Sequence, residues 1–358
     1  MYKNDFYKEL HGIVCDYDYI LVKCVRTQLN RWTKIYELPL NAMCKVRQSP
    51  QQLFYSFYKD IALAELKAYI LIEYGLMIHR VTRNLHFYKR RMNLLRNYDE
   101  LTERALKTLS DVVEKADRVL FRCDPPLQKG NITSNVDEIR FFNLRETLSD
   151  VKANKVVTGV RFVKSNRVFH LQIQQGQLLP RGFINASTVE WKPVSSYEID
   201  DLNIQERVDY HALSKRSHAL DLDEVMKTDD KTFIVTGVRF RVVDGHLNLQ
   251  VHLSKFDFLK GELVNSIWHS KENAHNRQQI VLTPPVNSSQ PLSKDNQYLE
   301  FTLEDNPQKT VPIIDVQEVA SDPSVPLAGI GIYYRASGFV APKIISYDIL
   351  SYLSVIAN

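Results

Sequence analysis

The segment TGVRF occurs twice in this chain, as residues 158–162 and 236–240, and this recurrence constrains the fold more than any other feature. The same shift of 78 residues aligns, within one residue, Leu171-Gln172-Ile173 with Leu249-Gln250-Val251, Arg181-Gly182 with Lys260-Gly261, and Trp191 with Trp268. A fainter third copy begins at Leu327, where the glycine is kept and the arginine is lost. Agreement at separated points predicts one supersecondary unit that is present two or three times.

The residue order within each copy is typical of a β-strand. Between Val156 and Phe162, successive side chains point to opposite faces of an extended chain. One face is then mostly apolar, and the other face carries Arg161. We therefore predict an antiparallel β domain over residues 138–358. Its repeats are expected near 156–191, near 234–268 and, weakly, near 327–349. A three-sheet β-prism is the first choice of architecture, and a β-sandwich or jelly roll is the second.

The part of the chain before this domain is predicted to be helical from residue 12 to about residue 122. Ser49-Pro50-Gln51-Gln52 combines a capping residue, a proline at the first helical position and a glutamine, which indicates a helix start. Apolar residues then recur at spacings of three and four. The expected fold class is α+β, with a helical hairpin or bundle in residues 1–123, a proline-containing linker in 124–137 and the β domain behind it.

All four cysteines fall in the predicted helical domain: Cys15, Cys24, Cys44 and Cys123. Their even number and clustering favour two disulfides in one of three connectivities, over four buried thiols. Zinc is disfavoured because no CxxC pair is present. The tripeptides at Asn131, Asn185 and Asn287 are N-glycosylation candidates. These features favour an extracellular, disulfide-bonded glycoprotein, although the opening residues lack a signal peptide, so a presequence would have to be missing from this sequence.

No motif in the sequence predicts an enzyme class, and no cofactor is expected. The patterns HExxH, GxSxG, Walker A and GxGxxG are all absent. The acidic residues Asp221, Asp223, Glu224, Asp229 and Asp230 lack the spacing of an EF-hand and are predicted to form a solvated loop within a charged surface segment, 197–231. His246 and His252 share one face of a predicted strand without a third ligand, so no metal site is expected.

A basic stretch follows the predicted helix that starts at residue 50. Arg80, Arg83, Lys89, Arg90 and Arg91 form a candidate patch for an anionic partner such as a sulfated glycan or an anionic membrane surface. A solvated helix face is the favoured alternative. The formal net charge of +4, from 46 basic and 42 acidic residues, is too balanced to predict nucleic acid binding.

The repeated arginines and tryptophans are the candidate ligand-binding residues of the β domain. Arg161 matches Arg239 and Trp191 matches Trp268, and repeated cationic and aromatic side chains suit a glycan-binding face. Because tryptophan is usually substantially buried, a structural role is favoured for the two tryptophans.

The segments VVTGVRF (156–162), FHLQIQ (169–174), LLPRG (178–182) and WKP (191–193) resemble an uncharacterised family of secreted insect proteins described only as a domain of unknown function. The segments AELKAY (64–69) and ISYD (345–348) are similar to that family too. The resemblance covers most of the chain. It implies location outside the cell in an arthropod, and it implies no activity.

These observations predict a secreted, non-enzymatic protein that binds an extracellular glycan or protein through its β domain. The first alternative is a membrane-active, pore-forming protein that inserts its helical hairpin. The second is a hydrolase that uses Asp or Glu residues which no motif reveals.

Overall fold

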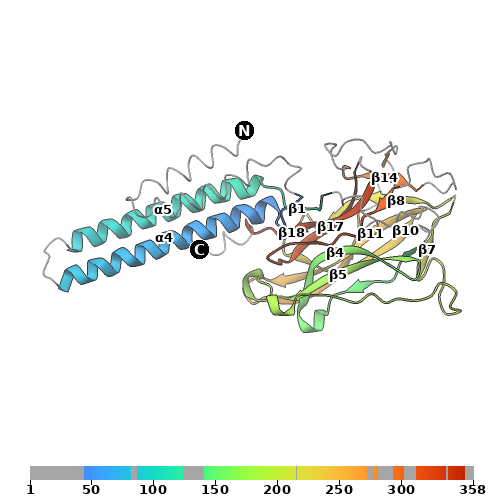
Figure 1. The fold of residues 1–358 in the computed structure, drawn as a ribbon, viewed down its shortest axis with the longest axis horizontal. Helices are drawn as coiled ribbons and strands as arrows, with labels where there is room; N and C mark the ends of the chain where they lie inside the picture. The colour runs from blue at the N-terminus through green and yellow to red at the C-terminus, as the bar shows by residue number, and fades with distance from the viewer. Residues whose placement is uncertain are drawn as a thin grey trace. The chain divides into compact units, whose positions relative to one another are not determined.

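The structure is a computed structural model and has an α+β fold (Figure 1). It describes the residues in eight ranges: 44–81, 87–123, 141–214, 216–271, 277–280, 293–301, 312–335 and 338–350. Two compact units divide the chain: a helical unit built on residues 50–117, and a β unit built on residues 44–49 and 118–356.

The helical unit contains the antiparallel pair α4 (Pro50–Val81) and α5 (Phe87–Lys115). The helix start predicted at Pro50 is confirmed. The amide of Gln51 donates to the carbonyl of Asp117 at 3.0 Å, and further along the pair the rings of Tyr69 and Tyr98 lie 4.7 Å apart. Buried apolar side chains occur on both helices near the end of the pair that contains Pro50 and Lys115: Leu53, Phe57, Ile61, Ala105, Leu109 and Val113. None of the helices in the described ranges combines the length and apolar character that crossing a membrane requires.

The prediction of helix up to about residue 122 extends too far. The helix ends at Lys115, and β1 (Val119–Leu120) follows it as part of the β unit. β1 pairs antiparallel with Ile344 and Ile345. The backbone groups of this segment therefore form hydrogen bonds within a sheet and not within a further helical turn.

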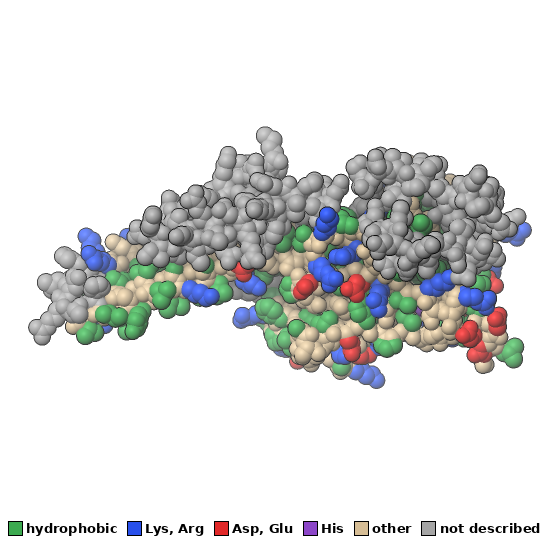
Figure 2. All heavy atoms as spheres, viewed as in Figure 1, with side chains coloured by type: hydrophobic (Ala, Val, Ile, Leu, Met, Phe, Trp, Pro, Cys, Tyr) green, Lys and Arg blue, Asp and Glu red, His purple; other side chains and the backbone are tan. Residues whose placement is uncertain are grey.

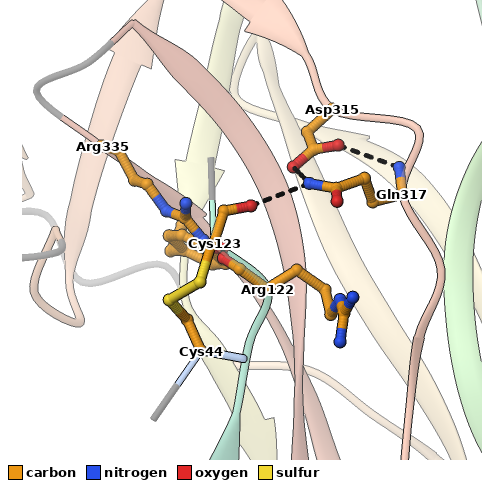
Figure 3. The surroundings of a disulfide bond; sticks show 7 residues. Cys44, Arg122, Cys123, Asp315, Gln317 and Arg335 are labelled. Carbon is orange, nitrogen blue, oxygen red and sulfur yellow. Dashed lines mark hydrogen bonds between the residues drawn. A yellow bond between two sulfur atoms is a disulfide. The ribbon is translucent and has the colours of Figure 1, made fainter. Parts of the chain in front are cut away.

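The β unit also holds the segments that lead into and out of the helices. A disulfide joins Cys44 to Cys123, whose Cα atoms are 4.8 Å apart. Figure 3 shows Gln317 beside this bond, where its side-chain amide donates to the carbonyl of Cys123 at 2.8 Å and to Asp315 at 3.0 Å. The other two cysteines, Cys15 and Cys24, lie outside the described residues.

The remaining strands of the β unit are β2 (Phe141–Asn143), β3 (Thr147–Leu148), β4 (Lys155–Ser165), β5 (Val168–Gln177), β6 (Glu190–Trp191), β7 (Tyr210–Ala212), β8 (Ala219–Leu222), β9 (Glu224–Met226), β10 (Phe233–Val243), β11 (His246–Asp257), β12 (Glu262–His269), β13 (Gln278–Gln279), β14 (Gln297–Glu300), β15 (Ile313–Ile314), β16 (Val319–Ala320), β17 (Leu327–Tyr334) and β18 (Phe339–Ser346). Short 3-10 turns occur at η2 (Val151–Ala153), η3 (Pro180–Gly182) and η4 (Ala186–Thr188).

In the described residues these strands form three sheets. One has the order β1-β18-β17-β9 with β15 added on β18, the second has β13-β14-β8-β11-β10-β3 with β12 added on β11, and the third has β16-β4-β5-β2-β7 with β6 added on β5. Each sheet is built around one long antiparallel hairpin: β4 with β5, β10 with β11, or β17 with β18. The two TGVRF segments therefore lie in the first strands of two such hairpins.

The three hairpins have corresponding neighbours. A short antiparallel strand, β16, β3 or β9, flanks the first strand of each hairpin. On the other side, β6, β12 or β1 pairs antiparallel with the second strand. A parallel strand, β2, β8 or β15, meets the start of each second strand. In the sheet built around β17 and β18, the strand β1, which follows α5, thus takes the place that β6 and β12 have in the other two sheets.

A glycine marks the same point in each hairpin. Gly159, Gly237 and Gly329 each follow a break in the pairing register and face the flanking short strand. A Cβ atom at these positions would lie within 3.0 Å of Ala320, of Leu148 or of Met226. The strands approach this closely because no side chain separates them.

One hydrophobic core joins the three sheets. Buried residues of the three hairpins belong to one cluster, including Phe162 from β4, Phe240 from β10 and Ile332 from β17. Phe142 of β2 adds an edge contact to Phe240 at 5.9 Å between ring centroids. Each hairpin therefore contributes one face to a shared interior.

The prediction that 197–231 is a charged surface segment is wrong in part. This range contains β7, β8 and β9, and Leu220, Leu222 and Val225 are buried in the common core. Apolar residues alternate with acidic ones in this range, and these segments form strands. A prediction based on the charged residues alone did not detect this alternation.

Candidate functional site

The predicted ligand-binding residues form two stacked pairs. The guanidinium of Arg161 lies 4.3 Å from the ring centroid of Trp191, and that of Arg239 lies 3.8 Å from the ring centroid of Trp268. The tryptophans come from β6 and β12, the strands that occupy corresponding places in the two sheets. The arrangement is a cation–π contact in both cases.

Each arginine is further held by a glutamine and a glutamate. Arg161 Nε donates to Gln172 Oε1 at 2.8 Å, and its Nη1 lies 3.7 Å from Glu318. In the other sheet, Arg239 Nε donates to Gln250 at 3.0 Å, and its Nη1 lies 3.7 Å from Glu146.

The sheet built around β17 and β18 has a different cation at the corresponding place. Gly331 stands where the other sheets have arginine, and it pairs with Lys343 across the hairpin. Lys343 Nζ lies 2.5 Å from Glu224, which is the residue opposite Gly331 on the flanking strand β9. Glu224 thus corresponds to Glu318 and Glu146, so a cation–glutamate pair occurs at this level of all three sheets.

These contacts support a structural function for the stacked pairs. Partial burial, and to a lesser degree the positive charge of Arg241, lowers the pKa of Arg239, while the charge of Glu146 opposes this effect. The fixed guanidinium groups connect each hairpin to its two neighbouring strands, and both arginines remain partly accessible to solvent.

Arg239 also lines a cleft of about 790 Å³ in the β unit. The cleft lies between the segment around β7 and the end of the β10–β11 hairpin, and its lining consists of Leu144, Glu206, Arg207, Val208, His211, Ala212, Ser214, Arg216, Ser217, Arg239, Phe240, Arg241, Val242, Asp244 and Gly245. Among the candidates Arg161, Trp191, Arg239 and Trp268, only Arg239 belongs to this lining.

The cleft carries a net positive charge. Its four arginines outnumber the two carboxylates, Glu206 and Asp244. Arg207, Arg216 and Arg241 are exposed, and within the described part of the chain the structure records no ion pair for them. The arrangement is suited to an anionic ligand, because guanidinium groups bind carboxylates and sulfate-like groups through two parallel hydrogen bonds.

A buried histidine, His211, belongs to the lining of the cleft. His211 Nε2 lies 3.2 Å from the carbonyl oxygen of Ser217, and the Ser217 hydroxyl donates to the carbonyl of Gly245 at 2.6 Å. Burial lowers the pKa of His211, so its imidazole is neutral at pH 7. These contacts connect the segment around β7 to the hairpin turn at Asp244 and Gly245.

The prediction of a solvated acidic loop is wrong for Asp221 and Asp223, which are 1% and 2% exposed. Arg277 donates to both oxygens of Asp223, at 2.8 Å and 2.6 Å. His246 Nδ1 lies 2.8 Å from Asp221. The buried carboxylates are stabilised by these partners, since an unpaired charge in a core is costly.

The other acidic and histidine residues considered as metal ligands have separate partners. Asp229 pairs with Lys227 at 2.8 Å, and Asp230 with Lys255 at 3.4 Å. His252 Nδ1 lies 2.8 Å from the Thr236 hydroxyl. In the described ranges, no group of three or more His, Cys, Asp or Glu residues is arranged to hold a metal ion.

The structure describes some residues of the predicted basic patch and one of the predicted glycosylation sites. Arg80, Lys89 and Arg90 are exposed on the helix pair, and Arg91 pairs with Glu73. Asn185 is half-buried, and its side-chain oxygen accepts from the Ser187 amide at 3.2 Å at the start of η4. Arg83, Asn131 and Asn287 lie outside the described residues.

Sequence reasoning missed the partners of the candidate arginines. Gln172 and Gln250 lay within the aligned segments LQI and LQV, so the shift of 78 residues was a usable signal for them. Glu146 and Glu318 adjoin strands of two residues, which have no detectable alternation. Arg207, Arg216 and Arg241 come from separate segments, and only the fold brings them to one cleft.

Part of the chain is similar to a protein family of unknown function. No curated protein matches the chain. Residues 41–139 and 131–173 match a family model, and these ranges contain α4, α5 and the first TGVRF segment. The description of that family states neither an organism nor a cellular location, so insect origin and secretion stay predictions. Over these ranges the chain is similar to an uncharacterised family described as a domain of unknown function (DUF4803).

Proposed function

We propose that this protein is a non-enzymatic binding protein of the extracellular space, and that its arginine-lined cleft takes an anionic segment of a glycan. The observation that carries the proposal is the placement of Arg207, Arg216, Arg239 and Arg241 around one cleft of about 790 Å³. Sulfated or uronic acid sugars present the anionic groups that such a set of guanidinium groups binds.

The shape of the site favours a glycan over a folded protein as the ligand. A concave site of this volume is in the range of sites for small molecules, whereas protein partners commonly use broad, flatter surfaces. Apolar lining residues such as Leu144, Val208 and Val242 provide surface for the carbon faces of sugar rings. Arg239 is held in place by Trp268, so part of the binding surface is ordered before the ligand arrives.

The disulfide between Cys44 and Cys123 supports an extracellular location, because such bonds persist in oxidising compartments. The glycosylation candidate Asn185 is consistent with the same location. Secretion in an insect is implied by the family resemblance and forms part of this proposal.

We further propose that the β unit is a β-prism built from three copies of one ancestral hairpin. The corresponding neighbours of the three hairpins, the glycines at equivalent register and the cation–glutamate pair in each sheet support this interpretation. Copies of one unit around a common core account for why TGVRF occurs twice.

The proposal is tested by binding of the full chain to sulfated and unsulfated forms of the same glycans. We expect binding to the sulfated forms, weakening as salt is raised. The double variant Arg216→Glu/Arg241→Glu reverses two exposed charges of the cleft, and we expect its affinity to fall by roughly tenfold or more.

The matched control is Lys152→Glu, a charge reversal at an exposed site of the β unit outside the cleft lining. It should bind like the unchanged protein. Equal loss of binding in both variants would indicate only a nonspecific effect of net charge, and equal binding to neutral and sulfated glycans would contradict the proposal. Circular dichroism of each variant reports whether the β unit has kept its fold.

A further inference from the structure

The helical unit exposes a stripe of apolar side chains along α4. Six of them recur at spacings of three and four residues, which places them on one side of the helix. They are between 40% and 84% exposed: Leu63, Leu66, Ile70, Tyr74, Met77 and Val81. Figure 2 shows hydrophobic side chains gathered along this helix pair. Contiguous apolar surface of this kind is unusual on a protein that has no partner.

Positive charge is concentrated at the same end of the helix pair where the stripe finishes. From residue 74 to residue 98 the sequence contains six Lys or Arg residues and no Asp or Glu. Among these cations, Arg80 on α4 and Lys89 and Arg90 on α5 are exposed. The acidic residue just before this range, Glu73, pairs with Arg91.

Exposed aromatic and flexible apolar residues lie among these cations. Tyr88 and Met92 at the start of α5 are 66% and 55% exposed, and Tyr74 and Met77 lie on the stripe of α4. Tyrosine favours the boundary between lipid headgroups and hydrocarbon, since its ring is apolar and its hydroxyl is polar.

We propose that this end of the helix pair docks the protein on an anionic lipid surface. The apolar stripe of α4 would enter the headgroup region, while Arg80, Lys89 and Arg90 lie near lipid phosphates and carboxylates. Cations near such a surface strengthen the attachment. The charged residues Asp60 and Lys67 on α4 favour docking along the surface over insertion through it, because charges in hydrocarbon are costly.

The charge distribution argues against a second copy of the chain as the occupant of the stripe. A second copy would bring the same positive charge to the contact, whereas an anionic lipid surface complements it. This inference concerns the helical unit and is independent of the glycan cleft on the β unit.

The experiment uses the full chain with vesicles of phosphatidylcholine alone and of phosphatidylcholine mixed with phosphatidylserine. We expect sedimentation with the mixed vesicles, reduced by salt, and little with phosphatidylcholine alone. The triple variant Ile70→Gln/Met77→Gln/Val81→Gln removes apolar side chains at exposed sites and should bind roughly tenfold or more weakly. A second variant, Lys89→Glu/Arg90→Glu, should lose its preference for phosphatidylserine.

Matched controls lie on the β unit. Leu202→Gln changes an apolar side chain that is 99% exposed, and Lys152→Glu changes an exposed cation. Both should bind vesicles like the unchanged protein. Helical circular dichroism checks that each variant is folded.

Any one of four results would overturn the proposal. The first is failure of the unchanged protein to bind the mixed vesicles, and the second is unchanged binding in both test variants. The third is a dimer, measured by light scattering, that the triple variant converts to a monomer without any change in vesicle binding. The fourth is release of dye trapped in the vesicles, which would indicate insertion and pore formation instead of surface docking.

Discussion

Phe162 and Phe240 stack on one another in the core of the β unit, with ring centroids 6.4 Å apart and planes inclined by 8°. These are the last residues of the two TGVRF segments, so the residues that match in sequence also meet in space. Ile332, at the corresponding place of β17, belongs to the same cluster. The central layer of the core is therefore formed by equivalent positions of the three hairpins.

Replacing either of these phenylalanines should strongly destabilise the β unit. We expect Phe162→Ala and Phe240→Ala to lower the free energy of unfolding by about 3 to 5 kcal/mol each, because both side chains are buried and their loss leaves a cavity. Urea unfolding followed by tryptophan fluorescence provides the measurement. Phe183→Ala is the control, since that ring is 62% exposed and its removal should have little effect.

The glycines at the close approaches should not tolerate a methyl group. Gly159→Ala and Gly237→Ala place a Cβ against the flanking strand, and we expect each to lower the free energy of unfolding by about 1 to 3 kcal/mol. Gly75→Ala is the opposite case, because nothing lies within 4 Å of its added Cβ in α4. That substitution should raise helix stability by up to about 1 kcal/mol. A gain in thermal midpoint for the strand variants would contradict the packing described here.

Acidification should weaken the β unit through His170. Burial, and to a lesser degree the positive charge of Arg145, lowers the pKa of this histidine to about 4. An unfolded chain binds the proton near pH 6.5, so the stabilising effect is complete above that pH and is lost as the pH falls towards 4. Unfolding at pH 7 and pH 4.5 should show a decrease of up to about 3 kcal/mol, and His170→Leu should reduce this difference. An unchanged difference in the variant would assign the acid sensitivity to other groups.

The helical unit should respond to pH in the opposite direction. Burial raises the pKa of Glu65 on α4 to about 7, from a value of 4.5 in the unfolded chain. Between these values the folded state keeps the proton that the unfolded state has released, so the contribution of Glu65 to stability falls as the pH rises from about 4.5 to 7. Thermal unfolding followed by helical circular dichroism at pH 5.5 and pH 8 measures the effect. Glu65→Gln cannot ionise, and we expect it to remove this part of the pH dependence.

The parts of the fold that sequence predicted well are those with a local physical signal. Ser49 followed by Pro50 marked the start of α4, because the proline needs no hydrogen bond there. The alternation in VVTGVRF indicated a strand, and β4 includes all of that segment. The α+β class followed from these two kinds of pattern.

The rest depended on contacts between distant segments. Glu318 reaches Arg161 from a strand of two residues, and such a strand has no period to detect. Asp223 appeared to be a surface residue because its partner, Arg277, follows 54 positions later. The cleft required segments from three parts of the chain, and its charge emerges only when the fold has brought them together.

The disulfide between Cys44 and Cys123 joins residues that lie before α4 and after α5 in the sequence. It therefore determines whether cleavage by a protease within the helices separates the two parts of the chain. A single cut anywhere between these two cysteines opens the polypeptide without separating its pieces. The nicked protein would migrate as one species until a reductant released two fragments, so damage or maturation within the helices would escape detection on a non-reducing gel.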